Sequence, residues 1–137
     1  MAKKILIIDD SALMRRVISD IIKENYDDVE ALDTAVNGLE GFDKLVSKPG
    51  YYDLVILDIN MPKMNGLELL EMLQKNRMNE TVVVVSTVAR ESAAETIRAL
   101  ELGAVDFLKK PENFYEVKSE GFKTCLLYTS PSPRDCS

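Results

Sequence analysis

The stretch Ile5-Leu6-Ile7-Ile8-Asp9-Asp10 places two carboxylates directly after four consecutive aliphatic residues. An apolar run without polar alternation is typical of a strand that is buried on both faces of a parallel sheet. A weaker strand is expected at residues 30–35. Three later runs share the first pattern and also end in polar residues: 53–57 before Asp58, 81–85 before Ser86 and Thr87, and 104–108 before Lys109, Lys110 and Pro111.

Apolar residues recur at spacings of three and four between these strands, which is the pattern of helices with one buried face. Ser11 is an expected N-cap, because its hydroxyl can accept from the free N–H groups of a first turn. Gly103 is an expected stop, because glycine adopts the left-handed conformation that ends helices. The expected helices are a segment after Ser11 with Leu13, Met14, Val17, Ile18, Ile21 and Ile22; a segment opening at Asn37-Gly38 with Leu39, Phe42, Leu45 and Val46; 67–74 with Leu67, Leu70, Met72 and Leu73; 92–102; and a fifth from about 113 that fades by about 123.

Strands and helices therefore alternate along the chain, which implies right-handed crossovers and helices on both faces of a parallel sheet. The sequence predicts an α/β fold with a doubly wound, five-stranded sheet. We expect the flavodoxin-like strand order 2-1-3-4-5, in which the first and third strands are neighbours. The fifth helix is expected to be truncated.

Composition excludes several classes of function. The 137-residue chain carries a formal net charge of −6, which argues against a nucleic-acid interface because that needs a basic face. Histidine is absent, so this chain offers no imidazole base, no histidine metal ligand and no phosphohistidine. Each apolar run is too short for a signal peptide or a membrane span. We expect a cytoplasmic protein without membrane insertion.

The last thirteen residues, 125–137 (CLLYTSPSPRDCS), do not continue the pattern. They contain both cysteines of the chain, two prolines and three serines, with no helical period. We interpret residues 1–124 as one domain and residues 125–137 as a disordered or non-native tail.

Carboxylates end two of the central strands. Asp9 and Asp10 follow the first strand and Asp58 follows the third, so neighbouring strands bring three negative charges into one small volume. Such a cluster is unfavourable unless a cation neutralises it, and carboxylate oxygens suit Mg²⁺. Ser86 and Lys110 add a hydroxyl and an ammonium at the same edge. Each residue alone also fits a helix cap or an ordinary loop, so the combination carries the prediction.

These residues resemble the receiver domain of bacterial two-component response regulators over about residues 3–120. The resemblance rests on the pair Asp9-Asp10, the block Asp58-Ile-Asn-Met-Pro62-Lys-Met-Asn-Gly66, Ser86 after the fourth strand and Lys110-Pro111 after the fifth. It implies that Asp58 accepts a phosphoryl group and that Mg²⁺ is the cofactor.

The same resemblance implies a role for each further residue of the site. The Mg²⁺ ligands would be Asp9, Asp10, Asp58 and the backbone carbonyl of Asn60. The phosphoryl oxygens would be bound by Lys110 and by the hydroxyl of Ser86, with Thr87 as the alternative hydroxyl. Phe107 would change rotamer, Pro62 and Gly66 would shape the loop after Asp58, and Lys110-Pro111 would be a cis peptide.

A sensor histidine kinase is the expected phosphodonor, and the output would be a separate protein or a missing C-terminal effector domain. Residues 98–107 with Lys110-Pro111 are similar to the receiver half of chemotaxis protein-glutamate methylesterases. No hydrolase domain fits within 137 residues, so we expect self-phosphoryl transfer and autodephosphorylation and no separate enzyme activity.

Three alternatives stay open. The chain could be a fragment of such a methylesterase, or a receiver-like interaction module that takes no phosphate. A Mg²⁺-dependent aspartyl phosphatase is less favoured, because that family needs D-x-D where this chain has Asp9-Asp10. A flavin or nucleotide binder is disfavoured because no glycine-rich phosphate loop occurs.

Overall fold

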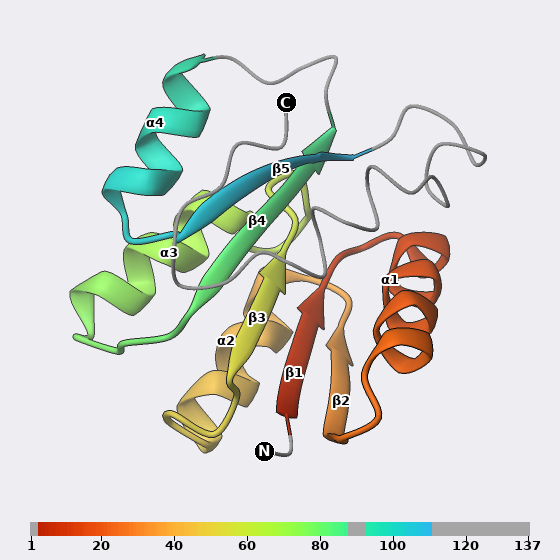
Figure 1. The fold of residues 1–137 in the computed structure, drawn as a ribbon. Helices are drawn as coiled ribbons and strands as arrows, with labels where there is room; N and C mark the ends of the chain where they lie inside the picture. Colours follow the sequence, from red (N-terminus) through yellow and green to blue (C-terminus); the bar gives the residue numbers. More distant parts are fainter. Residues whose placement is uncertain (1–2, 88–92, 111–137) are drawn as a thin grey trace.

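A computed structural model describes residues 3–87 and 93–110, and Figure 1 shows their arrangement as strands and helices in strict alternation. The elements are β1 (Lys3–Ile8), α1 (Ala12–Asn25), β2 (Val29–Ala35), α2 (Gly38–Ser47), β3 (Leu54–Leu57), α3 (Gly66–Lys75), β4 (Val82–Thr87), α4 (Ala93–Glu101) and β5 (Asp106–Lys110).

The five strands form one parallel sheet in the order β2-β1-β3-β4-β5. This confirms the predicted doubly wound fold and its strand order. The register pairs Ile8 of β1 with Ala35 of β2 on one side and with Leu57 of β3 on the other. The ends of these strands are therefore level, and the residues that follow them emerge at one edge of the sheet.

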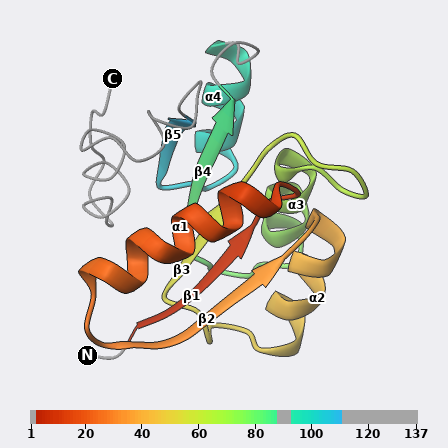
Figure 2. The ribbon, with the colours of Figure 1, turned by 90° about the vertical axis from the view of Figure 1, so that its right-hand side faces the viewer.

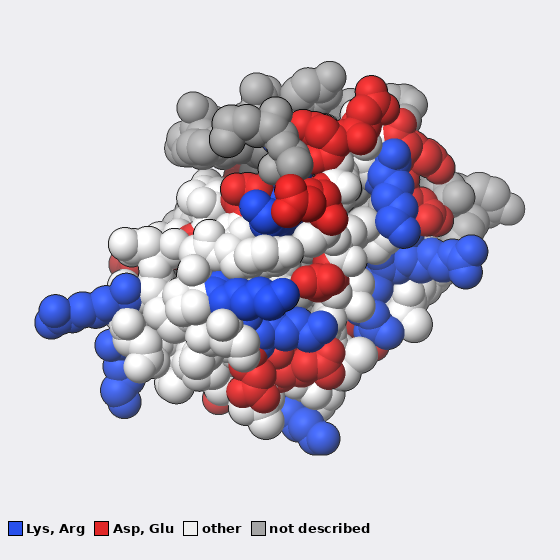
Figure 3. Space-filling model, turned by 90° about the horizontal axis from the view of Figure 1, so that it is seen from below, with Lys and Arg blue, Asp and Glu red and all other residues white. Residues whose placement is uncertain are grey.

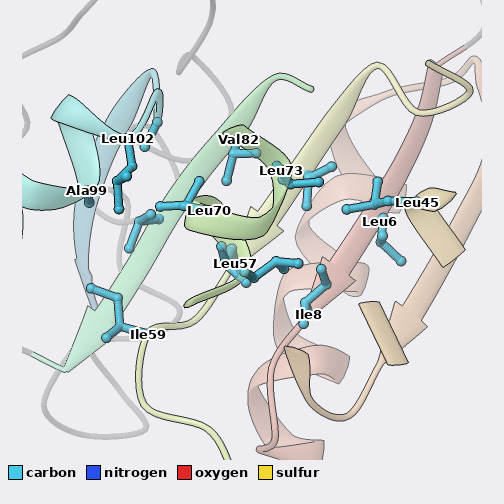
Figure 4. Packing of buried hydrophobic residues seen from close by; sticks show 14 of the residues in the cluster. Leu6, Ile8, Leu45, Leu57, Ile59, Leu70, Leu73, Val82, Ala99 and Leu102 are labelled. Atoms are coloured by element: carbon cyan, nitrogen blue, oxygen red, sulfur yellow. The ribbon is translucent and has the colours of Figure 1, made fainter. Parts of the chain in front are cut away.

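The side chains of β1, β3 and β4 alternate between two apolar clusters on opposite faces of the sheet. Ile5 and Ile7 of β1 pack with α1, while Leu6 and Ile8 pack with residues of α2 and α3. Figures 1 and 2 show α1 on one face and α2, α3 and α4 on the other. Figure 4 shows the second cluster, in which Leu57, Leu70 and Leu73 lie between the sheet and its helices. Both faces of a parallel sheet are normally buried under helices, so each face has its own apolar cluster.

Two strands reach further into the polar residues than the sequence indicates. β4 includes Ser86 and Thr87, and β5 includes Lys109 and Lys110, where the prediction ended both strands at the last apolar residue. The pairs Ser86–Lys109 and Thr87–Lys110 continue the ladder between these strands. Backbone hydrogen bonds do not depend on side-chain polarity, so an apolar pattern cannot locate such an end.

Some predicted apolar faces are broader than the buried ones. Leu13, Leu39 and Val46 remain exposed, with 51%, 47% and 48% of their surface accessible. Leu69, which the predicted face omitted, is fully buried. Periodicity identifies a helix and the approximate direction of its core face, but the neighbouring helices decide how wide that face is.

At the amino edge of the sheet, charges of both signs lie side by side. The ammonium of Lys4 on β1 lies 3.8 Å from the carboxylate of Glu30 on β2. The backbone N–H of Lys4 donates to the carboxylate of Asp53 at 2.9 Å. The ammonium groups of Lys4 and Lys48 both lie over the ring of Tyr51, at 5.3 and 4.5 Å from its centroid. Figure 3 views the molecule from this side and shows Lys and Arg interspersed with Asp and Glu.

The predicted fifth helix, the tail at 125–137 and the Lys110-Pro111 peptide bond lie outside the described residues. Within residues 3–87 and 93–110, none of the helices is long and apolar enough to cross a membrane.

Candidate functional site

Three carboxylates meet at the carboxyl edge of the sheet. Asp9, Asp10 and Asp58 each present an oxygen atom, and these atoms all lie within 4.8 Å of one another. Asp9 and Asp58 are buried, with 2% and 3% of their surface accessible, whereas Asp10 is exposed. The pairing of Ile8 with Leu57 brings Asp9 beside Asp58, and the N–H of Asp58 donates to the Ile8 carbonyl at 2.9 Å.

The loop that carries the first two carboxylates is held at several points. The backbone N–H of Asp9 donates to Ala35 at 3.1 Å, which ties the end of β1 to β2. The carboxylate of Asp9 accepts from the Ser11 N–H at 2.9 Å, and the Ser11 hydroxyl accepts from the Met14 N–H at 3.2 Å as the predicted N-cap of α1. The cap fixes where α1 begins and therefore also fixes the two acidic residues before it.

The loop after Asp58 folds back against the start of α2. Lys63 and Met64 have φ values of 50° and 79°, a left-handed conformation that costs free energy for residues with a side chain. Their carbonyls accept from the N–H groups of Leu39 and Gly38, both at 3.1 Å. The loop therefore supplies acceptors for the first turn of α2, which otherwise lacks them.

The same loop ends in a capping box at the start of α3. Asn65 accepts from the Glu68 N–H at 2.9 Å, and Glu68 accepts from the Asn65 N–H at 2.9 Å. Gly66 follows, and its N–H donates to Ile59 at 2.9 Å. This bond joins the end of the loop to the residue after Asp58, and the role of Gly66 in shaping the loop stays a prediction. Pro62 is exposed within that loop.

Two residues predicted for phosphoryl binding and switching lie on the neighbouring strands. Ser86 is fully buried near the end of β4, next to β3. Phe107 is half-buried on β5, opposite Val84 of β4, and packs against the apolar cluster under α3 and α4. Thr87 and Lys110 are the paired last residues of β4 and β5; their side chains, like Pro111, lie outside what the structure describes.

The chemistry of the acidic cluster follows from its charge. Two ionised carboxylates at about 5 Å repel each other by roughly 3 kcal/mol at an effective dielectric constant of about 20. Three such groups with oxygens turned toward one another are a donor set for a hard cation such as Mg²⁺, which takes carboxylate oxygens and retains waters. The residues present therefore fit that ion.

A family model described as the response regulator receiver domain matches residues 5–120 of the chain. The chain belongs to this family. The receiver domain covers most of the sequence, and its match begins at the first aliphatic residue of β1.

Curated relatives of this receiver domain include protein-glutamate methylesterase/protein-glutamine glutaminases. The protein from Clostridium acetobutylicum is 40% identical over 115 residues, which are 83% of this chain and 32% of that protein. The protein from Caldanaerobacter subterraneus is 47% identical over 109 residues, which are 79% of this chain and 28% of that protein. The chain thus spans about a third of the length of these relatives.

Solved structures give the same relationship. The response regulator domain of Thermotoga maritima CheB superposes with a TM-score of 0.75 at 36% identity, over 93% of this chain and 90% of that one. The CheX–CheY–BeF3–Mg+2 complex from Borrelia burgdorferi gives a TM-score of 0.72 at 26% identity, over 93% of this chain and 90% of that one. The predicted resemblance to receiver domains, and to those of chemotaxis methylesterases, is confirmed.

Sequence reasoning missed two contributors to the receiver domain site. The Nη1 atom of Arg15 donates to the Asp9 carbonyl at 2.7 Å. Gly38 touches the loop after Asp58, because a Cβ built on it would lie 2.1 Å from the Met64 oxygen. The sequence does offer a signal for Arg15, which is a basic residue one turn into the helix that follows the acidic pair Asp9-Asp10. The contact at Gly38 joins segments that are remote in sequence, and no local pattern indicates it.

Proposed function

We propose that this receiver domain is a phosphoacceptor, in which Asp58 takes a phosphoryl group from a partner histidine kinase in a Mg²⁺-dependent reaction. The observation that carries the proposal is the meeting of Asp9, Asp10 and Asp58, with three carboxylate oxygens inside 4.8 Å at the carboxyl edge of the sheet. Phosphorylation then changes a protein-binding surface and so transmits a signal.

Asp9, Asp10, Asp58 and the backbone carbonyl of Asn60 would hold the ion. Bound there, Mg²⁺ neutralises the negative charge that accumulates when a carboxylate meets a phosphoryl group. Asp10 is the exposed member of the set, whereas Asp9 and Asp58 are buried. Burial keeps the acceptor oxygen oriented and excludes most of the water that competes with the donor.

The transfer step needs little covalent chemistry from the protein. A carboxylate oxygen of Asp58 forms the new bond to phosphorus while the bond from phosphorus to the donor nitrogen breaks, and the imidazole keeps that electron pair. Lys110 pairs with the phosphoryl oxygens, and Ser86 or Thr87 donates a hydrogen bond to them. Water later hydrolyses the acyl phosphate. Because the chain has no histidine, the phosphohistidine must belong to the partner.

The switch would run through β4 and β5. Ser86 lies on β4, and Phe107 on β5 packs at the edge of an apolar cluster that includes Leu102 and Ala104. A hydrogen bond from Ser86 to a phosphoryl oxygen would shift the end of β4 and open space into which the Phe107 ring turns. The surface of α4, β5 and the following segment would then differ between the two states.

The output of the switch is supported by the relatives. Proteins 40% and 47% identical to this chain are methylesterases of which it covers about a third. We therefore propose that a chain of this kind regulates a chemotaxis methylesterase domain or a separate output protein. Within this receiver domain itself, the proposed reactions are self-phosphoryl transfer and autodephosphorylation.

The acceptor is tested by incubating the chain with Mg²⁺ and acetyl phosphate and measuring the intact mass. We expect an adduct of one phosphoryl group that is absent in Asp58→Asn and in chelator. Asp27→Asn, which removes an exposed carboxylate outside the acidic cluster, should still form the adduct. No adduct on the unmodified chain, or an adduct that survives Asp58→Asn, would contradict the proposal. Multiple-turnover hydrolysis of an unrelated phosphate ester would instead favour the phosphatase.

A further inference from the structure

Arg15 of α1 contacts the loop that carries Asp9 and Asp10. Its Nη1 atom donates to the backbone carbonyl of Asp9 at 2.7 Å, while its backbone N–H donates to the Ser11 carbonyl at 3.0 Å. The side chain therefore reaches back over the N-terminus of its own helix to Asp9, the first residue after β1. It is half-buried there.

With this bond, each polar group of Asp9 is held by a different element. Its N–H donates to Ala35 at the end of β2, its carboxylate accepts from Ser11 in the loop, and its carbonyl accepts from Arg15 on α1. A trans peptide plane places the Asp9 carbonyl and the Asp10 N–H on opposite sides, so fixing the carbonyl fixes the plane that leads into Asp10.

We propose that Arg15 is a positioning residue for the cation site, which holds the Asp9–Asp10 peptide so that both carboxylates meet Asp58. The inference rests on the proposed function, because it concerns the same three carboxylates. Arg15 acts through the Asp9 carbonyl, and its guanidinium is not a ligand of the cation.

The sign of the effect separates this role from a simple effect of charge. A positive charge near a cation site weakens cation binding, so its removal would strengthen binding if charge were the whole contribution. Loss of a contact that orients the ligands weakens binding, commonly by about tenfold. A positioning role therefore predicts the opposite change in Mg²⁺ affinity from the one that electrostatics alone predicts.

The neighbouring residue provides a matched control. Arg16 has the same charge and lies on the same helix, but its side chain is 83% exposed and approaches Asp20 at 4.0 Å. Arg15→Met and Arg16→Met each remove one guanidinium and keep an unbranched apolar chain. Arg15→Lys retains the charge and one donor group but loses the planar fork.

The test is a Mg²⁺ titration of each variant, followed through the backbone amide signals of residues 9–11 and 58–60. We expect the dissociation constant to rise about tenfold in Arg15→Met, to rise less in Arg15→Lys and to stay level or fall slightly in Arg16→Met. Urea unfolding without Mg²⁺ separates a loss of affinity from a loss of fold. Should Arg15→Met not fold, Arg15→Lys carries the test.

Two failures are distinguishable. Normal binding by the unmodified chain, with equal or tighter binding by Arg15→Met, or by Arg15→Lys where Arg15→Met does not fold, would overturn the positioning role and leave the phosphoacceptor proposal intact. No saturable Mg²⁺ binding by the unmodified chain would overturn the cation site itself and the inference with it.

Discussion

Gly66 lies against the backbone carbonyl of Asp58 so closely that a Cβ at position 66 would be 2.4 Å from that oxygen. It would also be 2.9 Å from the Cα of Ile59. Both contacts are with backbone, which cannot rotate away as the end of a side chain can. The first residue of α3 thereby determines how near the helix comes to the residue proposed to accept the phosphoryl group.

Gly66→Ala is expected to destabilise the fold and to disturb Asp58. The added methyl must push α3 or the Asp58 carbonyl aside, and crowding of this kind costs typically 1–3 kcal/mol, by a rough estimate. We expect a fall of about that size in the free energy of unfolding in urea, together with slower labelling of Asp58 by acetyl phosphate.

Gly103→Ala provides the comparison for this prediction. Gly103 has a φ of 106°, and a Cβ there meets no atom within 4 Å. Alanine at position 103 should therefore cost about 1–2 kcal/mol through its backbone conformation alone and leave labelling unchanged. Equal labelling rates in the two variants would refute the idea that the contact at Gly66 positions Asp58.

The capping box of α3 is expected to contribute measurably to stability. Asn65→Ala removes the acceptor of the Glu68 N–H and should lower the free energy of unfolding by about 1 kcal/mol. Asn37→Ala should cost a similar amount at α2, where the Asn37 side chain accepts from Glu40 at 2.8 Å. At α3 the Glu68 side chain also accepts a hydrogen bond from the Asn65 N–H. A double-mutant cycle of Asn65→Ala and Glu68→Ala should therefore show coupling between the two residues. Additive losses in that cycle would count against the reciprocal bond.

The sequence was sufficient for much of this fold because local and global signals agree. Apolar runs such as Ile5–Ile8 identify buried strands, and Ser11 and Asn37 are N-caps of helices at the predicted positions. Asp9, Asp10 and Asp58 meet as predicted because the ends of parallel neighbours are level. Their metal and phosphoryl roles remain predictions.

The parts that sequence reasoning missed depend on contacts between remote segments. In the sequence Gly38 is one more glycine at the start of a helix, and only the structure shows that the loop at Met64 packs against it. The polar extension of β4 through Thr87 depends on β5 as its neighbour. Leu13 fits the apolar period of α1 and is nevertheless exposed. None of these features leaves a periodic signal, since each is decided by the partner segment.

The hydrogen bond between buried Tyr52 and half-buried Asp33 is expected to make stability fall in alkaline solution. The Tyr52 hydroxyl donates to Asp33 at 2.5 Å. Burial, and next the hydrogen bond and charge of Asp33, raise the pKa of Tyr52 well above its usual value of 10.0. Above about pH 10 the unfolded chain releases this proton and the folded chain keeps it, so stability declines as pH rises.

Tyr52→Phe tests this account in two ways. At neutral pH it should lower the free energy of unfolding by about 1–3 kcal/mol, because a hydrogen bond to a charged group is lost. Between about pH 9 and 11 its stability should fall less steeply than that of the unmodified chain. Tyr51→Phe leaves the Tyr52–Asp33 pair in place and should keep the steeper fall. Urea unfolding at each pH measures both effects, and parallel slopes for Tyr52→Phe and the unmodified chain would contradict the prediction.

The acidic cluster is expected to reverse the order of stability of two chains when Mg²⁺ is added. Without Mg²⁺, Asp10→Asn removes one of three neighbouring negative charges and should raise the free energy of unfolding by about 1 kcal/mol, because Asp10 is exposed and water screens its repulsion nearly as strongly as in bulk solvent. With Mg²⁺ at about a hundred times its dissociation constant, the unmodified chain should gain about 2.7 kcal/mol. The variant Asp10→Asn has lost a ligand, so Mg²⁺ should raise its free energy of unfolding much less.

Asp27→Asn should follow the unmodified chain under both conditions, because Asp27 lies outside the cluster. A Mg²⁺ gain as large in Asp10→Asn as in the unmodified chain would show that the ion is not held by these carboxylates.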